Sequence, residues 1–246
     1  MTNPFYDTDL AAAHDAHYSD YGRNAAPLVL ERLERAGHRS GTVVDLGCGS
    51  GGMARLISDA GYDVLGVDMS ADMLDLARRR APAARFERGS LWNVRLPPAV
   101  AVTAIGEVLS YTSDPRAGDP PLERLFHDVR AALEPGGVLL FDVAAPGRAG
   151  PEGLSEGFDD HPGYSVYSRA SENADRTILE RRIVLFRRDG EQYRRSDEVH
   201  RLRLFQPDRI LLLLRASGFE ATTINGYGDL ELPDGWFGFC ATAAAR

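Results

Sequence analysis

Two carboxylates and a cluster of glycines occur together near the start of the chain. Asp45 precedes the segment Gly47-Cys48-Gly49-Ser50-Gly51-Gly52, and Asp68 ends the run 64–67. This pattern predicts a strand, a tight turn, a helix and a second strand that ends in a carboxylate. Such a unit surrounds the sugar of a nucleoside cofactor with backbone N–H groups and an acid. The chemistry of the site then depends on the charge of that cofactor.

The charge of Asp45 favours one kind of cofactor over another. Gly47, Gly49 and Gly52 satisfy the dinucleotide fingerprint, with Asp68 nineteen residues after Gly49 as the ribose-binding acid, which indicates NAD or FAD. A pyrophosphate, however, would be repelled by the negative charge of Asp45. S-adenosylmethionine has the same ribose but carries an ammonium and a sulfonium. We therefore expect S-adenosylmethionine, with S-adenosylhomocysteine as product, and keep an NAD-linked reductase as the alternative.

An ordered set of motifs over residues 40 to 145 resembles the class I S-adenosylmethionine-dependent methyltransferases. Val43 to Gly52 looks like their first motif, and Asp68 matches their ribose-binding acid. Arg88-Gly89-Ser90-Leu91 and the segment 133–140 follow in the expected order. An insertion before the last helix resembles the small-molecule branch. The resemblance implies an α/β fold, Rossmann-like and doubly wound, whose mostly parallel seven-stranded sheet has an antiparallel final strand.

The same resemblance implies the residues that contact the methionine part and the ribose. Asp45 would favour the ammonium, directly or through water, and Asp68 would accept the ribose hydroxyls. The backbone would approach the methionine part at four positions of the turn: Gly47, Cys48, Gly49 and Gly51. For Cys48, a small side chain in a crowded turn is favoured over a reactive thiol.

Further cofactor contacts are expected on later segments. Met69 would lie against the adenine, although an ordinary core position is an equal alternative, and Ser90 with Leu91 would meet the adenine edge. Many relatives have Asp where Ser90 stands. Gly106 would line the passage toward the methyl group. Two residues of the N-terminal stretch, Tyr18 and Arg23, complete the predicted cofactor contacts.

Methyl transfer from a sulfonium is an in-line displacement, so the protein mainly holds the reactants collinear in a dry site. A general base is needed only where the acceptor must lose a proton. His200 is the candidate, because it shares a strand face with Leu202 and Leu204, and a hydrogen-bonded structural histidine is the alternative. Glu107 is the second catalytic candidate, as a base or as an attractor of a cationic amine. Aromatic walls could come from Tyr18, Tyr21, Tyr111, Tyr164 and Tyr167.

The order of elements predicts a single domain over residues 1–246. Strands are expected at 42–46, 63–67, 84–87, 100–105 and 137–143, and helices at 52–60, 70–80 and 120–133. Residues 1–24 form an expected lid, and a better helix is expected to begin at Ala26-Pro27.

The amino-acid composition changes from residue 146 onward. A glycine-rich connection leads to two β-like runs, 177–188 and 192–205, joined by the hairpin signal Asp189-Gly190. Leu179, Ile183 and Leu185 share one face of the first run, which Arg181 interrupts, so that face is expected to cover something. We therefore predict an antiparallel β insertion over the cleft at 146–205, then a helix at 207–217 and strands at 219–224 and 236–243.

Composition restricts the partners. The net charge of −8 and pI near 5.3 argue against nucleic acid, and a chain without lysine has no lysine nucleophile. Cys48 and Cys240 lack metal-ligand spacing, so no metal site is expected. The longest apolar run, 210–214, is too short for a membrane span. We expect a cytoplasmic enzyme with a small-molecule acceptor and leave a homodimer open. Transfer of another group from an S-adenosyl cofactor and a non-catalytic cofactor-binding scaffold remain alternatives.

Overall fold

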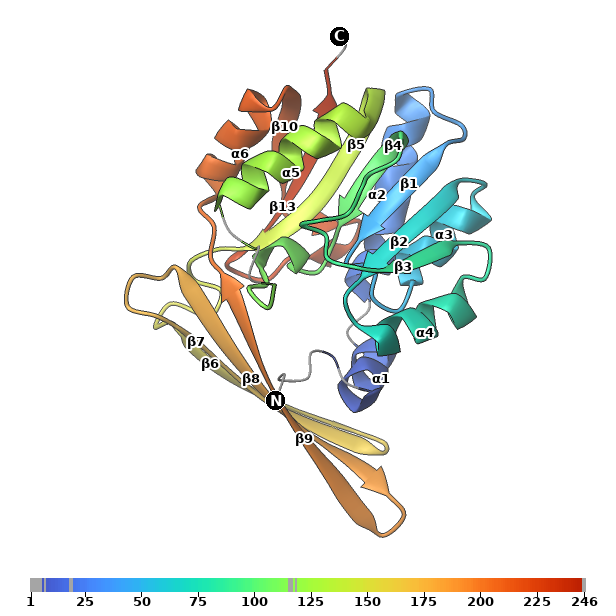
Figure 1. Cartoon of the computed structure of the whole chain (residues 1–246). Helices are drawn as coiled ribbons and strands as arrows, with labels where there is room; N and C mark the ends of the chain where they lie inside the picture. Colours follow the sequence, from blue (N-terminus) through green and yellow to red (C-terminus); the bar gives the residue numbers. More distant parts are fainter. Residues whose placement is uncertain (1–5, 7, 18–19, 115–116, 118, 245–246) are drawn as a thin grey trace.

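The computed structural model describes residues 6, 8–17, 20–114, 117 and 119–244. Its centre is a seven-stranded sheet in the order β10-β13-β5-β4-β1-β2-β3 (Figure 1). Only β13 runs antiparallel to its neighbours, which confirms the predicted Rossmann-like fold with an antiparallel final strand. The strands span Thr42–Leu46 (β1), Asp63–Asp68 (β2), Arg85–Arg88 (β3), Ala99–Ala104 (β4), Leu133–Ala144 (β5), Phe219–Ile224 (β10) and Trp236–Ala243 (β13).

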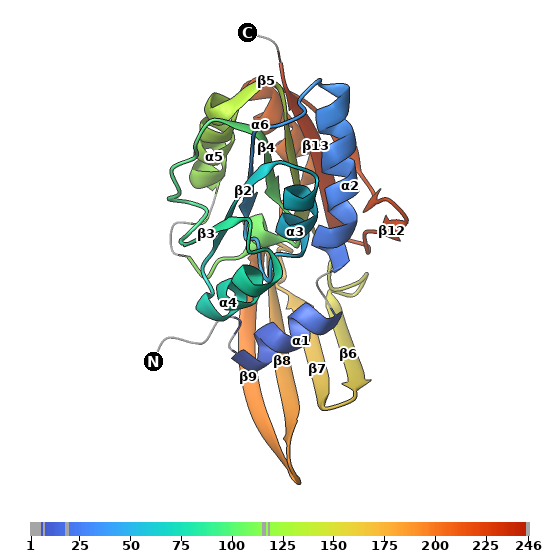
Figure 2. The ribbon, with the colours of Figure 1, turned by 90° about the vertical axis from the view of Figure 1, so that its right-hand side faces the viewer.

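Helices cover both faces of this sheet, which is why its central strands are almost wholly apolar. All six residues of β4 are buried. Figure 2 shows α5 on one side of the sheet and α2 with α3 on the other. Side chains of α5 and α6 join one core cluster, and those of α2 and α3 join a second. The helices span Asp20–Arg35 (α2), Gly52–Asp59 (α3), Ala71–Arg80 (α4), Asp119–Ala132 (α5) and Pro207–Ala216 (α6).

The insertion is a four-stranded antiparallel sheet in the order β6-β7-β8-β9, and it extends away from one edge of the core (Figure 1). Its strands are Leu154–His161, Tyr164–Glu172, Ile178–Asp189 and Gln192–Arg203. The second hairpin was predicted, whereas β6 and β7 lie within 146–176, the segment expected to be a flexible glycine-rich connection. That expectation was wrong for both strands, and the edge strand β6 is exposed along most of its length and shows no alternation of apolar residues.

The N-terminal part forms two helices. Helix α1, Thr8–His17, lies beside α4 and the insertion, and Figure 2 shows it crossing the insertion strands. Helix α2 begins at Asp20, so the prediction of a start at Ala26-Pro27 was wrong. Tyr21 and Ala25 pack into the same core cluster as Val29, and this packing extends the helix about two turns before Pro27.

Shorter elements complete the chain: a 3-10 turn η1 at Val108–Ser110 and a small hairpin of β11, Gly226–Tyr227, with β12, Leu230–Glu231. Within the described ranges, no helix combines the length and apolar character that crossing a bilayer requires. The same residues contain no group of three His, Cys, Asp or Glu side chains that could hold a metal ion.

Candidate functional site

A cavity of about 470 Å³ opens where the carboxyl ends of β1, β2 and β4 meet the insertion. This is the edge at which ligands bind in open α/β sheets. Segments far apart in the sequence contribute its walls. The residues that line it include Tyr6, His14, Tyr21, Asp45, Gly47, Cys48, Gly49, Asp68, Met69, Leu91, Trp92, Gly106, Glu107, Tyr111, Arg148, Arg181 and Trp236.

The glycine-rich turn forms the floor of the cavity. The N–H groups of Gly47 and Cys48 donate to the carbonyl of Val67, at 2.7 and 3.1 Å, and fix the turn to β2. Gly47 has φ +69°, and a Cβ there would lie 2.4 Å from Val108, so this close approach requires glycine. Gly51 differs from its neighbours. A Cβ at Gly51 would lie 3.0 Å from Ala77 of α4, which explains the glycine by packing, and Gly51 does not line the cavity.

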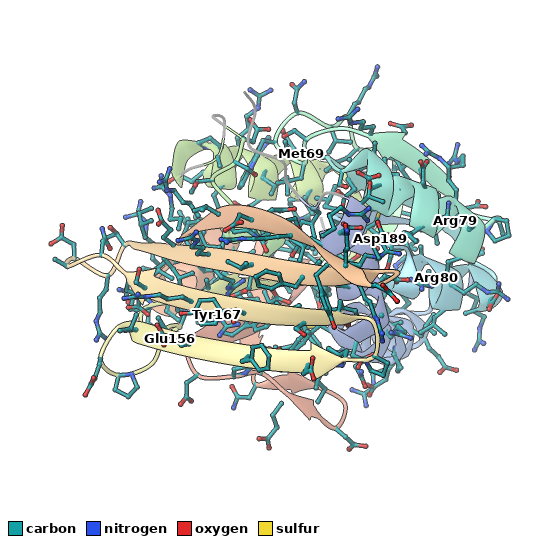
Figure 3. All side chains as sticks on the ribbon, turned by 90° about the horizontal axis from the view of Figure 1, so that it is seen from below. Met69, Arg79, Arg80, Glu156, Tyr167 and Asp189 are labelled. Atoms are coloured by element: carbon teal, nitrogen blue, oxygen red, sulfur yellow. The ribbon has the colours of Figure 1, made fainter. Side chains whose placement is uncertain are left out.

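Asp68 lies at the end of β2, and each of its carboxylate oxygens accepts one backbone N–H group. It accepts the N–H of Gly49 at 2.9 Å and that of Ser70 at 2.8 Å. Burial raises the pKa of Asp68 despite these donors. Met69 follows it, lines the cavity and is 38% exposed, so the alternative of a core position does not hold for Met69. Figure 3 shows Met69 close to the edge of the core.

Asp45 is a buried carboxylate with a neutral partner. It is 4% exposed at the cavity wall, and the Thr103 hydroxyl donates to it at 2.7 Å. The described residues include no cation in ion-pair contact with it. Burial therefore raises the pKa of Asp45 to about 7. A positive charge nearby would lower this pKa and let Asp45 ionise at lower pH. A ligand bound in the cavity can supply that charge.

The neighbouring thiol is not activated. Burial and the nearby carboxylates Asp45 and Asp68 raise the pKa of Cys48 well above its usual range. Cys48 is therefore protonated at neutral pH. The interpretation as a small side chain in a crowded turn fits this environment.

The turn after β4 is held by a carboxylate that the sequence did not single out. Asp142 of β5 accepts the N–H groups of Gly106 and Glu107 and, at 2.7 Å, the hydroxyl of Tyr227. Burial raises the pKa of Asp142 to about 6. These bonds hold Glu107 in a left-handed conformation, φ +60°, which directs the chain across the cavity. No local sequence pattern identifies Asp142, because its partners come from the turn after β4 and from β11.

Glu107 is fully paired. Its Oε1 accepts Nε of Arg148 at 2.7 Å, and its Oε2 accepts Nη2 of Arg181 at 3.1 Å. Burial alone would raise the pKa of Glu107, but the two guanidiniums outweigh burial and hold that pKa below its usual value. Glu107 is therefore a poor proton acceptor, and its charge is more than balanced. The interruption of an apolar strand face by Arg181 was the sequence signal for this contact.

His200 does not line the cavity. Its Nε2 lies 2.7 Å from Oε2 of Glu198, and its ring packs against Tyr6 and Tyr111 at 5.0 and 5.6 Å between centroids. With 2% exposure, this is the environment of the structural histidine that the sequence left as the alternative. The geometry therefore corrects the expectation that His200 faces the acceptor. The histidine that does line the cavity is His14 of α1, whose burial lowers its pKa to about 4.

Three predicted cofactor contacts are placed differently or lie outside the described residues. Ser90 is not in the cavity wall, because its hydroxyl accepts the N–H of Trp92 at 3.1 Å and closes a local turn. Arg23 pairs with Asp20 at 3.1 Å and does not line the cavity. Tyr18 lies outside the described residues. Leu91 does line the cavity, as expected, and Trp92 beside it was missed.

Aromatic residues from four segments line the other end of the cavity. Tyr21 packs against Trp236 with ring centroids 4.3 Å apart, and Tyr111 lies next to Tyr6, with hydroxyls 3.2 Å apart. Tyr167, by contrast, bonds Glu156 on the outer face of the insertion, where Figure 3 shows both. Tyr164 also does not line the cavity. The structure therefore brings Tyr21 and Tyr111 to the cavity and leaves Tyr164 and Tyr167 outside it.

Comparisons with known proteins agree with this fold. A family described as a methyltransferase domain matches residues 43–137. The chain is 27% identical to a dTDP-3-amino-3,6-dideoxy-alpha-D-glucopyranose N,N-dimethyltransferase of Streptomyces fradiae, over 87% of this chain and 83% of that protein. It is 24% identical to a putative methyltransferase of Geobacillus sp. (strain WCH70), over 89% and 92% of the two chains. A methyltransferase structure from Clostridium acetobutylicum ATCC 824 shares the fold, with TM-score 0.80, 19% identity and coverage of 96% and 98%.

Proposed function

Since the chain belongs to the class I S-adenosylmethionine-dependent methyltransferases, we propose that Asp45 and Asp68 hold this cofactor and that the insertion encloses the acceptor. The protein is a methyltransferase that transfers the methyl group of S-adenosylmethionine to nitrogen or oxygen of a small acceptor. The sequence alternatives, a reductase and a non-catalytic scaffold, have no support among the relatives.

The buried carboxylate of Asp45 carries this proposal. An uncompensated acid with its pKa raised to about 7 disfavours a pyrophosphate and favours a cationic group beside it. The ammonium of the cofactor would supply such a charge, and Asp45 and Gly47 both line the cavity where it would bind. Asp68 retains lone pairs for two ribose hydroxyls while Gly49 and Ser70 hold its orientation. Met69, Leu91 and Trp92 offer apolar surface for the adenine.

The protein's contribution to catalysis is position and exclusion of water. Bound in this cavity, S-adenosylmethionine supplies an electrophilic methyl group whose transfer removes the positive charge on sulfur. The chain holds the acceptor in line with that group and keeps the cavity dry. Neither His200 nor Glu107 is placed as a free base, so the geometry supports an acceptor that reaches the cavity already nucleophilic.

We assign the lid function predicted for residues 1–24 to helix α1. At one end, Asp9 accepts Nη1 of Arg187 and Nε of Arg194, both on the insertion, at 2.7 and 2.6 Å. At the other end, Asp15 pairs with Arg80 of α4, which also donates at 2.7 Å to Ser50 of the glycine-rich turn. The helix thus joins the insertion to the cofactor turn across the cavity. The cytoplasmic location and the homodimer stay predictions.

Titration calorimetry with S-adenosylmethionine, S-adenosylhomocysteine and NADH tests the cofactor. We expect both S-adenosyl ligands to bind, NADH not to bind, and Asp68→Ala to lose the S-adenosyl ligands. Asp63→Ala, at the exposed start of the same strand, serves as the control and should bind normally. Binding of NADH alone would replace the proposal with a reductase. A screen of small amines, alcohols and acids by product mass then distinguishes methyl transfer from transfer of another group, and tight binding without any turnover would support a scaffold.

A further inference from the structure

Two arginines reach the acceptor end of the cavity and share a single carboxylate. Arg148 uses Nε and Arg181 uses Nη2 to bond opposite oxygens of Glu107. No other side-chain hydrogen bond from either guanidinium to a described residue is present, so four of the five N–H donors of each are available to a ligand. Both side chains line the cavity and keep 18% and 20% exposure, while Glu107 keeps 3%. At this point the cavity wall therefore presents guanidinium N–H groups, while the carboxylate of Glu107 is almost fully buried.

The charge of this cluster is unbalanced. Two guanidiniums and one carboxylate sum to one positive charge. Arg181 lines the cavity from a strand position between Leu179, which is buried, and Ile183, which is partly buried. Arginine is costly to bury unless its charge is matched, and apolar residues of similar volume would pack such a face as well or better. Stability alone does not explain a second guanidinium here. A ligand with one negative charge would complete the cluster.

The surroundings suit a flat anionic group. Arg148 stacks over the Trp236 ring, with Cζ 4.8 Å from its centroid, and is thereby held in orientation. The hydroxyls of Tyr6 and Tyr111 lie in the cavity wall and near enough to Arg181 to interact with its charge. Burial raises the pKa of both phenols, so both stay protonated, and one hydroxyl donates to the other. Guanidinium forks are the donors that carboxylates bind in proteins.

We propose that Arg148 and Arg181 bind a carboxylate of the methyl acceptor and so select acceptors that carry one. This assignment rests on the proposed function and adds the acceptor class to it. A monoanion matches the single excess charge of the cluster. The same geometry argues against a cationic amine at this point, because both oxygens of Glu107 are already occupied by arginine.

Three probes of similar shape and different charge test the proposal: benzoate, benzyl alcohol and benzylammonium. Each is titrated by ligand-observed NMR into the full-length protein, with and without saturating S-adenosylhomocysteine. We expect benzoate to bind at least about tenfold more tightly than the other two, since a charge-assisted hydrogen bond contributes that much. Preference for benzylammonium, equal binding of all three, or no binding of benzoate would overturn the proposal.

Substitutions in the cluster test whether benzoate binds at these arginines. Arg181→Gln and, separately, Arg148→Gln should each weaken benzoate about tenfold, and Glu107→Gln should strengthen it by freeing both guanidiniums. Arg182→Gln is the matched control, because Arg182 is the next residue on β8 but pairs with Asp197 on the outer face, 57% exposed. Unchanged benzoate affinity in both arginine variants would contradict the assignment. Thermal unfolding and S-adenosylhomocysteine binding show whether each variant is folded.

The products of turnover distinguish failure of the carboxylate site from failure of the proposed methyltransferase activity. A screen of acceptors offered both as free acids and as primary amides should yield methylated products from the acids only. Methylation of amides as well as acids would overturn the carboxylate site and leave the methyltransferase intact. Failure of S-adenosylhomocysteine to bind, with selective benzoate binding preserved, would instead remove the proposed function and retain an anion site.

Discussion

The two ends of the cavity are built in different ways. At the cofactor end, Asp45, the glycine turn and Asp68 belong to one strand-turn-helix-strand unit, and the side chains are acidic. At the acceptor end, Glu107, Arg148 and Arg181 come from three distant segments and carry a net positive charge. Under the proposed function, this difference lets one cavity sort two ligands by charge: the cationic cofactor to the acids and the acceptor to the arginines.

The largest effect is expected at the cofactor end. Asp68→Ala removes the acceptor of two ribose hydroxyls, and it also loosens Gly49 and Ser70. Affinity for S-adenosylhomocysteine should fall about a hundredfold, since hydrogen bonds to a charged group contribute roughly 1.5–3 kcal/mol. Calorimetry measures this loss, and benzoate binding should stay unchanged. Equal losses of both ligands would show that the two ends are not independent.

The two ends of the cavity also differ in how far the sequence predicts them. The cofactor end was predictable because short apolar strand runs, glycine spacing and an acid at a strand end are local signals, and Asp45, Gly47 and Asp68 all lie in the cavity. Within that unit, Gly51 packs against Ala77 and does not line the cavity, and spacing alone does not predict such packing. Ser90 also does not line the cavity, and its hydroxyl instead closes a local turn.

The acceptor end was predictable only in outline. The second insertion hairpin was found from its turn and alternation, but β6 has no apolar pattern. His200 was chosen for its strand face, which is correct, yet the N-terminal segment covers it: the Tyr6 N–H donates to Glu198 at 2.8 Å, and the Tyr6 ring packs on His200. Arg148 and Asp142 acquire their roles only through long-range contacts. No local signal encodes such pairings.

A smaller effect is expected between the two ends. Tyr227→Phe removes a buried donor from Asp142, which positions Gly106 and Glu107. The free energy of unfolding should fall by about 1–2 kcal/mol, and kcat should fall more than cofactor affinity. Urea unfolding and steady-state kinetics measure both. Tyr62→Phe removes a hydroxyl bond to His38 away from the cavity and should lower stability without changing kcat. Equal kcat losses in the two variants would argue against a positioning role.

A weaker effect is expected where α1 joins the insertion. Asp9→Asn removes the charge that pairs with Arg187 and Arg194, whose side chains are about half exposed, so the loss of stability should be at most about 1 kcal/mol. Hydrogen bonds from these arginines lower the pKa of Asp9, so its stabilising contribution is present at neutral pH and is lost as pH falls through that pKa. Amide exchange in α1 should speed up selectively. Asp189→Asn, an exposed partner of Arg194 at 3.7 Å, is the control, and faster exchange there too would remove the assignment to Asp9.

The smallest effect is expected for Ser90→Ala. Because the Ser90 hydroxyl closes a local turn and does not line the cavity, affinity for S-adenosylhomocysteine should stay within about twofold. Calorimetry under the conditions used for Asp68→Ala gives a direct comparison. A loss of tenfold or more would restore Ser90 to the adenine site and contradict its placement outside the wall.

The most direct test of the central claim is the affinity for S-adenosylmethionine between pH 5.5 and 7.5, measured on the unaltered protein and on Asp45→Asn. The pKa of Asp45, raised to about 7 in the ligand-free protein, means that binding a cation below pH 7 must release a proton. Affinity should therefore rise up to about tenfold per pH unit and level off above pH 7, while Asp45→Asn binds weakly without this rise. Binding that is independent of pH in the unaltered protein, or equally tight in Asp45→Asn, would contradict the assignment of Asp45 to the cofactor's positive end.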